Sequence, residues 1–421
     1  MRRNLKGSVL TWMVVFVAPW AFAGWLINNS HATSQNEATG RNEKQDWVVQ
    51  EVSSRIRGKE FPKSINDGRE NFAIEYTLND QLQHEAERLL SAYKPDFGAI
   101  VVVEARTGKV RAMASFERGE KIGENLAIRG TFPAASIFKM VTAAAAVDRR
   151  GMDPEGLIHF NGGSHTLYRR NAMSTVVNRW TREVSLREAF ARSFNTAFAR
   201  VAFEKLQPQD LEEYAFRFGF NRQIHGDLLF DQSVTEIPSE KNFHMAEIAS
   251  GFNRVTKMSP LHGALMAATI ANDGKMPKVQ MIEKVTDQSN RVVLEGTPAT
   301  DFDVLTADGN DKMKVLMEET IVSGTSRKSF KHLRRDRRFR EVELGGKTGS
   351  LTGTNPRGKT DWFVGYAIGD NGEKLAIAAV TVHEKLWRVK SSILAQSVVR
   401  RHFRDMEAWV ARHDQASETE R

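Results

Sequence analysis

The sequence predicts an α+β fold in which strands from both ends of the chain close one antiparallel sheet around a mostly helical middle. An apolar run over Gly98–Glu104 is followed by Arg106-Thr107-Gly108 and a second strand-like run, Lys109–Ser115, the pattern of a hairpin. Three more strand-like runs come near the C-terminus. Strands collected at the two ends, without a strand–helix–strand alternation, are typical of α+β proteins.

The sequence predicts one helix before the hairpin and several more in the middle of the chain. A helix over Leu78–Ala92 is predicted ahead of the hairpin, and the stretch Glu117–Arg327 is predicted to be mostly helical. Its clearest helices are Ser136–Arg149, Ser185–Lys205, Gln209–Phe218 and Pro260–Asn272.

The C-terminal strands are predicted over Val342–Leu351, Thr360–Ile368 and Glu373–His383. Asn371-Gly372 lies between the last two, and Asn-Gly between apolar runs is a strong hairpin signal. A helix over Trp387–Arg412 follows, because apolar residues recur there at helical spacing.

The N-terminus has the pattern of a membrane anchor. Basic residues precede an uncharged apolar stretch over residues 8–27, which as a helix would cross about 30 Å of hydrocarbon. The basic flank predicts a cytoplasmic N-terminus and an extracytoplasmic domain. Ala21-Phe22-Ala23 also matches a signal-peptide cleavage site, but the apolar stretch continues past it, which favours the anchor.

These observations divide the chain into five predicted parts. Residues 28–70 are polar and irregular, with one modest apolar cluster, and are interpreted as a tether. The parts are a cytoplasmic tail (1–7), a transmembrane anchor (8–27), a polar tether (28–70), a folded domain (71–413) and a polar tail (414–421).

Composition excludes several kinds of chemistry. The 421 residues are 41% hydrophobic and 27% charged, enough for a sizeable core. The chain has no cysteine, which excludes disulfides, thiolate catalysis and cysteine metal sites. None of the 11 histidines lies in a recognisable metal motif, so no metal and no cofactor is predicted.

The chain has a net charge of +8. Basic residues are concentrated over Arg327–Arg340, where eight of fourteen residues are Lys or Arg. Such a run is usually a solvated face, with anionic lipid or polymer contact as the alternative. No nucleic-acid motif accompanies it, so nucleic acid is not predicted as a partner.

Ser136 and Lys139 are the predicted nucleophile and base. In Ser136-Ile137-Phe138-Lys139 the two polar side chains lie three residues apart and share one face of a predicted helix. Pro133 just before this helix and the alanine run Ala143–Ala146 within it fit a helix start. The N–H of Ser136 would be one of the unpaired donors of that start, available to an oxyanion.

Ser91-Ala92-Tyr93-Lys94 has the same spacing. Pro95 follows it directly and disfavours helix at Lys94. We therefore interpret Ser91 as part of a solvent-facing helix end without a catalytic role.

Two further motifs follow in the chain. Ser193-Phe194-Asn195 lies in a predicted helix, although Ser-x-Asn also occurs twice in the tether. Lys347-Thr348-Gly349-Ser350 occurs once, on a predicted strand, and the next strand carries Asp361-Trp362-Phe363-Val364-Gly365.

In this order, Ser-x-x-Lys, Ser-x-Asn and Lys-Thr-Gly-Ser resemble the penicillin-binding protein and serine β-lactamase superfamily, and most closely the class B transpeptidases. The resemblance extends from about Leu78 to Arg412. It implies a five-stranded antiparallel sheet flanked by helices, with a mostly helical subdomain inserted. The chain departs from class B in one respect, because only about forty residues stand between anchor and domain, where a pedestal domain is typical.

The resemblance implies acyl transfer through a covalent ester on Ser136. Lys139 would act as the base and Ser193 would relay a proton. Lys139 has to be neutral, and burial and a second cation, Lys347, are the two causes that would lower its pKa from about 10.4.

The remaining motif residues are implied to bind substrate. The N–H groups of Ser136 and Ser350 would form an oxyanion hole, and Thr352 would line the same strand edge. The substrate-binding set is Asn195, Lys347, Thr348, Gly349 and Ser350.

The implied partners are peptidoglycan stem peptides as substrates, β-lactams as covalent inhibitors and proteins of cell-wall synthesis. Together with the anchor, the resemblance predicts a single-pass protein of the bacterial inner (cytoplasmic) membrane, with a periplasmic catalytic domain.

Other functions would use the same residues. A serine β-lactamase needs a further base to activate water, and no carboxylate between Ser193 and Lys347 can be assigned to it. A D,D-carboxypeptidase is a second alternative. A β-lactam sensor or a scaffold module without turnover is the alternative of another class.

Overall fold

The structure is a computed structural model that describes residues 42–119, 121–174 and 176–404. The chain divides into a short N-terminal unit, Met1–Asp46, and a main unit, Trp47–Arg421. The predicted tail 1–7, anchor 8–27, first part of the tether and tail 414–421 lie outside the described residues. Within the described ranges, no helix is long and apolar enough to cross a membrane.

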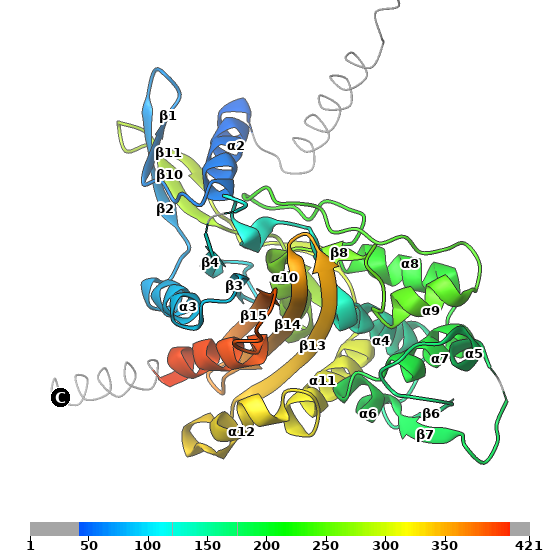
Figure 1. Cartoon of the computed structure of the whole chain (residues 1–421). Helices are drawn as coiled ribbons and strands as arrows, with labels where there is room; N and C mark the ends of the chain where they lie inside the picture. The colour runs from blue at the N-terminus through cyan, green and yellow to red at the C-terminus, as the bar shows by residue number, and fades with distance from the viewer. Residues whose placement is uncertain (1–41, 120, 175, 405–421) are drawn as a thin grey trace, which may run out of the picture. The chain divides into compact units, whose positions relative to one another are not determined.

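A five-stranded antiparallel sheet forms the centre of the main unit (Figure 1), which confirms the expected fold. The order is β13 (Glu343–Thr354), β14 (Arg357–Ile368), β15 (Lys374–His383), β3 (Phe97–Glu104) and β4 (Val110–Glu117). The two ends of the chain meet where β15 pairs with β3. β13 is an edge strand, so one side of it has no strand neighbour in this sheet.

Helices cover both faces of the sheet (Figure 1). On one face lies α10 (Pro260–Ala271), which packs against β14, β15 and β3 and has all of its 12 residues buried. Its sequence is apolar on every side, as a fully buried helix requires. On the other face, α3 (Asp80–Tyr93) packs on β4, and α12 (Arg327–Arg335) and a helix over 391–404 share a second apolar cluster with the sheet.

The middle of the chain is mostly helical, as predicted, but it also contains short strands. Six of them form three two-stranded sheets, and one of these sheets includes the strand just ahead of Ser136. The helices are α4 (Lys139–Ala144), α5 (Arg169–Met173), α6 (Leu186–Ala191), α7 (Asn195–Lys205), α8 (Pro208–Arg217), α9 (Phe243–Ala249) and α11 (Ala307–Val322). The strand pairs are β5 (Phe132–Pro133) with β8 (Lys257–Met258), β6 (Leu157–Phe160) with β7 (Arg182–Ser185), and β9 (Lys275–Pro277) with β12 (Thr300–Asp303).

The tether prediction is wrong for its second half. α2 (Glu43–Arg57) is a helix whose Val48, Val52 and Ile56 are buried. These residues recur every four positions, so they form one apolar stripe among polar neighbours. The segment is polar on average, so its composition alone did not indicate a helix with one apolar face.

A small second sheet explains where that stripe packs. Its order is β1 (Ser64–Asn66), β2 (Asn71–Tyr76), β10 (Ile282–Thr286) and β11 (Val292–Glu295), and it shares an apolar cluster with α2. Two of its strands come from the stretch predicted to be mostly helical, far away in sequence. The folded region therefore begins well before residue 71.

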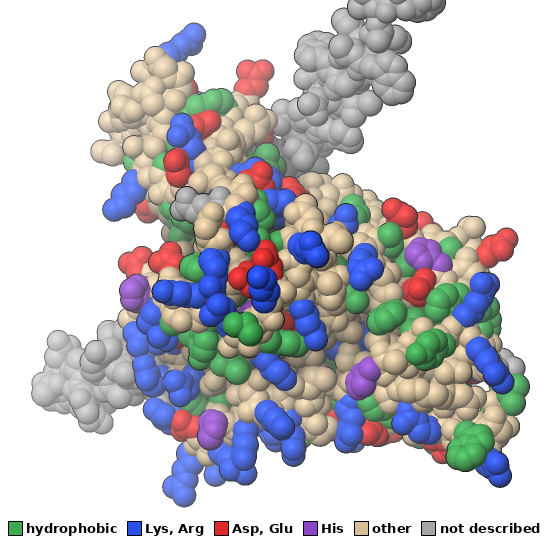
Figure 2. Space-filling model, in the orientation of Figure 1, with side chains coloured by type: hydrophobic (Ala, Val, Ile, Leu, Met, Phe, Trp, Pro, Cys, Tyr) green, Lys and Arg blue, Asp and Glu red, His purple; other side chains and the backbone are tan. Residues whose placement is uncertain are grey.

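The basic run over residues 327–340 is a solvated face, as predicted. Phe330 and Leu333 of α12 are buried, while all eight basic residues of the run are exposed. Figure 2 shows Lys and Arg side chains gathered over this part of the surface.

Candidate active site

Ser136 lies in a tight helical turn between β5 and α4. The predicted helix over residues 136–149 is continuous but irregular, because a 3-10 turn (Ala135–Phe138) precedes α4 and a wider turn (Ala145–Arg149) follows it. Ala135 has a φ of 49°, a left-handed conformation that is rare outside glycine and frequent at functional sites. This turn presents the half-buried Ser136 at the cavity wall.

Lys139 is fully buried and contacts the nucleophile. Its Nζ lies 2.9 Å from Ser136 Oγ, 2.7 Å from Asn195 Oδ1 and 2.5 Å from the carbonyl oxygen of Ser250. Asn195 Nδ2 donates to the carbonyl oxygen of His165 at 2.7 Å. Because that oxygen can only accept, the amide orientation is fixed and Asn195 Oδ1 must accept from Lys139.

This arrangement matches a neutral amine. A neutral lysine has two N–H donors and one lone pair, and the two obligatory acceptors, on Asn195 and Ser250, use both donors. The lone pair is then left for the hydroxyl proton of Ser136. Burial, and secondly the charge of Lys347, lower the pKa of Lys139 well below its ordinary value.

Ser193 lies in a break between α6 and α7, not inside one helix as predicted. Its φ is 58°, which interrupts the helical pattern. Its hydroxyl accepts from Lys347 Nζ at 2.9 Å, and Lys347 also donates to the carbonyl oxygen of Thr348 at 2.8 Å. In the described part of the chain no hydrogen bond joins Ser193 to Lys139, so the relay role stays a prediction.

The edge strand β13 forms the opposite wall. Lys347 is buried, and burial lowers its pKa to about 7. Thr348 Oγ1 lies 2.6 Å from Thr325 Oγ1, so the two hydroxyls are paired at the strand edge. A methyl group on Gly349 would lie 3.1 Å from the Ser136 nitrogen. A side chain at residue 349 would therefore require the strand or the Ser136 turn to shift by a few tenths of an ångström.

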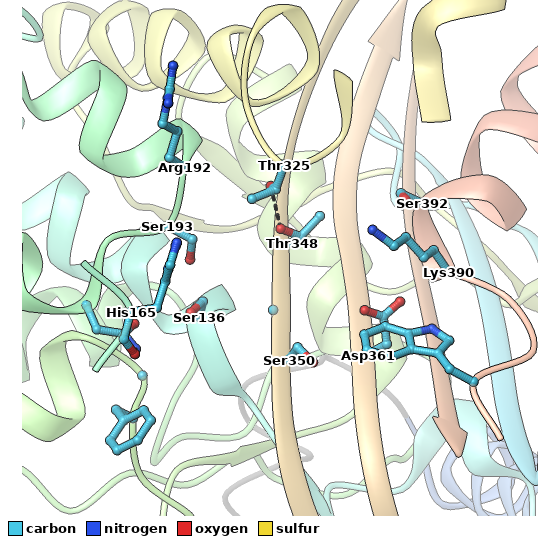
Figure 3. Close-up of a pocket in the computed structure, with 15 residues that line it drawn as sticks. Ser136, His165, Arg192, Ser193, Thr325, Thr348, Ser350, Asp361, Lys390 and Ser392 are labelled. Atoms are coloured by element: carbon cyan, nitrogen blue, oxygen red, sulfur yellow. Dashed lines mark hydrogen bonds between the residues drawn. The ribbon is translucent and has the colours of Figure 1, made fainter. Parts of the chain in front are cut away.

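A cavity of roughly 320 Å³ joins these groups (Figure 3). Six predicted residues line it: Ser136, Ser193, Asn195, Thr348, Gly349 and Ser350. Lys139 and Lys347 are buried behind the wall. Thr352 is exposed and lines a neighbouring hollow. Ser91 and Lys94 are both exposed at the end of α3, as expected of a pair without a role.

Sequence reasoning missed nine of the fifteen residues that line the cavity. Backbone carbonyls such as that of Ser250 carry no sequence signal, and the loop residues belong to no short motif. Asp361 had the best signal, because it directly precedes the Trp-Phe-Val-Gly strand. The missed lining residues are His165, Arg192, Gly251, Phe252, Thr325, Asp361, Trp387, Lys390 and Ser392.

Among the described residues, no group of three or more His, Asp or Glu side chains is arranged to hold a metal ion.

The fold and the site together place a half-buried serine beside a fully buried lysine at the wall of one cavity. The chain belongs to the family of the penicillin-binding protein transpeptidase domain, whose family model matches residues 98–404.

Curated relatives agree with this membership. The chain is 26% identical over 394 residues to the peptidoglycan D,D-transpeptidase PbpA of Mycolicibacterium smegmatis, covering 82% of this chain and 74% of that protein. It is 24% identical to penicillin-binding protein PbpB of the same organism, over 56% of this chain and 38% of that protein. Stage V sporulation protein D of Bacillus subtilis is 20% identical, over 77% of this chain and 52% of that protein. The chain thus spans about half or less of these last two relatives.

Solved structures show the same fold. PBPA from Mycobacterium tuberculosis has a TM-score of 0.64 at 22% identity, over 78% of this chain and 81% of that chain. Its imipenem acyl-enzyme complex has a TM-score of 0.63 at 22% identity, over 78% of this chain and 79% of that chain. The transpeptidase domain of penicillin-binding protein 3 from Burkholderia pseudomallei has a TM-score of 0.60 at 16% identity, over 79% and 96%.

Proposed function

We propose that the protein is a peptidoglycan D,D-transpeptidase that works through an acyl-enzyme on Ser136. The observation that carries the proposal is the buried Lys139, whose Nζ lies 2.9 Å from Ser136 Oγ and whose pKa burial lowers well below its ordinary value. The relatives named as peptidoglycan D,D-transpeptidases support the same activity.

The first half of the reaction forms the ester. Ser136 Oγ bonds to the carbonyl carbon between two D-alanines while its proton passes to Lys139 Nζ. The C–N bond then breaks, and the terminal D-alanine leaves with that proton. The N–H groups of Ser136 and Ser350 would hold the oxyanion, each worth about 3 kcal/mol in comparable sites.

The second half transfers the acyl group. An acceptor amine attacks the ester, loses a proton and restores the Ser136 hydroxyl. Thr348, Thr325 and the charge of Lys347 would hold a carboxylate, and the paired Thr325 and Thr348 hydroxyls at the strand edge support this. Peptide running along the free edge of β13 would add a strand to the sheet.

One observation disfavours fast hydrolysis. Among the described residues that line the cavity, Asp361 is the one carboxylate, and in Figure 3 it lies across β13 from Ser136. A β-lactamase needs a base beside the ester to activate water. This separation supports a long-lived acyl-enzyme.

The cellular setting is part of the proposal. We place the protein in the bacterial inner membrane, single-pass, with the catalytic domain in the periplasm, and we expect proteins of cell-wall synthesis as partners. The basic and apolar N-terminal sequence supports this setting.

The test uses the full chain and a stem pentapeptide ending in D-Ala-D-Ala, with and without a labelled D-amino acid acceptor. Mass spectrometry separates the transfer product from the hydrolysed tetrapeptide. We expect transfer to exceed hydrolysis when acceptor is in excess, and Ser136→Ala to lose both products. Tetrapeptide alone, even with acceptor, would establish a D,D-carboxypeptidase instead. Failure to release any D-alanine would refute the acyl-transfer proposal altogether.

A further inference from the structure

One histidine lines the active-site cavity on the side away from β13. Among the fifteen described residues of the lining, His165 carries the one imidazole. It is exposed, and in Figure 3 its side chain extends to Ser193 and lies beside Ser136. None of the short sequence motifs includes it. Ester formation by Ser136 and Lys139 does not require it either, so a titratable group of the cavity is left without a task.

The segment that carries His165 is fixed to the start of α7. The carbonyl oxygen of His165 accepts from Asn195 Nδ2 at 2.7 Å. The carbonyl oxygens of residues 163 and 166 accept from the Thr196 hydroxyl at 2.6 and 2.8 Å, and that of residue 164 accepts from the Thr196 N–H at 3.4 Å. Four consecutive carbonyl groups are therefore bonded to the two residues that begin α7. This pinning gives His165 a defined place next to the Ser-x-Asn motif.

The imidazole ring is also oriented. It packs edge-on against Phe194, with ring centroids 5.5 Å apart at 83°. It has a hydrogen bond with the backbone of Ser193 that raises the pKa of His165, so the backbone is the acceptor in that bond. The ring nitrogen at Ser193 therefore carries the N–H. In a neutral imidazole the other nitrogen has a lone pair, which is free to accept a proton.

The charged groups around the ring favour its neutral form. The pKa of His165 is lowered from its ordinary value, first by partial burial and then by its cationic neighbours Lys139, Lys347 and Arg182. These three groups face it from α4, β13 and β7. Asp361, the one carboxylate among the described lining residues, lies across β13. At neutral pH the ring is therefore a base and not an acid.

Transfer to an amine requires two proton losses. An alkyl amine arrives as an ammonium ion, because its pKa is about 10, and an ammonium nitrogen has no lone pair for attack. One proton must leave before the N–C bond forms. The other leaves afterwards and returns to Ser136 Oγ. Lys139 Nζ lies 2.9 Å from that oxygen and serves the second loss, so the first loss needs a different base.

We propose that His165 is the base that takes the first proton from the acceptor amine. This inference rests on the proposed function and adds a catalytic residue to its second half. The free ring nitrogen accepts a proton from the ammonium ion, and the neutral amine attacks the ester carbon. The second proton passes through Lys139 Nζ to Ser136 Oγ as the C–O bond breaks. The imidazolium, surrounded by cations, then releases its proton to solvent.

The same base favours an amine over water. Proton transfer from an ammonium of pKa about 10 to an imidazole is uphill by a few pKa units, whereas transfer from water, with a pKa of about 15.7, is uphill by many more. A bound amine is therefore activated far better than a bound water. This preference agrees with an acyl-enzyme that is long-lived until an acceptor arrives.

Two acceptors that differ in protonation test the role. Labelled D-alanine is an ammonium at pH 7, whereas hydroxylamine is already neutral and needs no base. The full chain is supplied with a stem pentapeptide ending in D-Ala-D-Ala, and mass spectrometry measures both transfer products and the hydrolysed tetrapeptide. His165→Gln should lower transfer to D-alanine by about a hundredfold. It should leave transfer to hydroxylamine, and hydrolysis, unchanged.

The pH profile is a readout that a purely structural role would not move. With the base present, transfer depends on the ammonium acceptor and the neutral ring, so the wild-type rate should be level between their two pKa values. Without it only the free amine reacts, and transfer by His165→Gln should rise about tenfold per pH unit over that range. Added imidazole should restore part of the transfer to D-alanine in His165→Ala.

The matched control is His159→Gln, since His159 is exposed on β6 of the same subdomain and is not among the residues that line the cavity. It should change none of these rates. Equal losses with both acceptors in His165→Gln would overturn the role of His165. So would a wild-type transfer rate that already rises tenfold per pH unit, a result that needs no variant.

Acylation by benzylpenicillin, measured in parallel, separates the two levels of the account. Normal acylation together with either of those results refutes the role of His165 alone. Hydrolysis without transfer to either acceptor refutes transfer itself, and the role with it. Absent acylation of the wild type refutes the proposed function.

Discussion

The two buried lysines of the site differ in their contacts and in their pKa. Lys139 contacts Ser136 Oγ, and its pKa is well below the ordinary value, while burial lowers the pKa of Lys347 to about 7. The charge of Lys347 is one cause of the low pKa of Lys139. At neutral pH the second lysine therefore helps to keep the first one neutral, and it still has a proton to offer a substrate carboxylate.

Burial of Lys347 predicts a pH-dependent stability. Its pKa is about 7 in the folded state and 10.5 ordinarily, so between these values the unfolded chain binds more protons. Stability from this group therefore rises with pH across that window and is constant below about pH 7. Relative to Lys347→Met, the free energy of unfolding of the wild type should rise by up to about 1.4 kcal/mol per pH unit in this window. Chemical unfolding of both proteins at pH 7 and pH 9 measures this rise. A stability difference between the two proteins that is the same at both pH values would contradict the assignment.

Residues of the site could be predicted from the sequence where they belong to a short motif. The hydrogen-bond partners of Lys139 were harder to predict. Asn195 was predicted as a substrate-binding residue of the site, but the carbonyl oxygens of Ser250 and His165 could not be predicted, since every residue has such an oxygen. Ser193 lines the cavity, and its contact with Lys347 depends on a left-handed backbone conformation that no sequence pattern predicted.

At the scale of elements, the turn before α4 depends on a glycine from another part of the chain. Gly251 has a φ of 66°, and a methyl group there would lie 2.0 Å from the carbonyl oxygen of Ala135. The neighbouring Ser250 supplies the acceptor for Lys139. The segment after α9 thus holds both the nucleophile's turn and its base.

Gly251→Ala should therefore slow acylation by tenfold or more and destabilise the fold by about 1–3 kcal/mol, because a clash adds to left-handed strain. Gly151→Ala is the matched control, since Gly151 has a φ of 63° and nothing within 4 Å of the added methyl. We expect it to cost about 1 kcal/mol with acylation unchanged. Time courses of acylation measure the rate, and thermal melts measure the stability. Equal effects of the two substitutions would count against this role of Gly251.

Long elements were predictable and breaks between them were not. Most strands of the central sheet and α10 are long apolar runs bounded by turn residues, so they could be predicted from the local sequence. The break at Ser193 and the start of the last helix at residue 391 are set by tertiary contacts, the latter by Asp361 on a distant strand. Local patterns do not contain such partners.

At the scale of the whole molecule, α2 and the small sheet enlarge the folded domain. Ser53 Oγ accepts from the backbone N–H of Leu229, and the carbonyl oxygen of Arg57 accepts from Asn125. The helix is thereby tied to segments far along the chain. The prediction of a tether failed here because β10 and β11, which complete the sheet, follow more than 200 residues later.

This packing predicts that α2 stabilises the catalytic domain. Val52→Asp places a charge at a site with 0% exposure and should cost about 3 kcal/mol or more. Val292→Asp on β11, where the side chain is 54% exposed, is the control and should cost about 0.5 kcal/mol or less. Denaturant unfolding measures both. Similar stabilities for the two variants would mean that α2 behaves as the tether that its composition suggested.

The most direct test of the central claim is covalent. The full chain is incubated with benzylpenicillin, and the adduct is followed over time by intact mass and located by peptide mapping. We predict one stable adduct on Ser136, absent in Ser136→Ala and retained in Ser91→Ala. It should form at least a hundredfold more slowly in Lys139→Arg, whose guanidinium cannot be deprotonated. No adduct, an adduct elsewhere, or one that disappears within seconds would contradict a transpeptidase that uses Ser136 and Lys139.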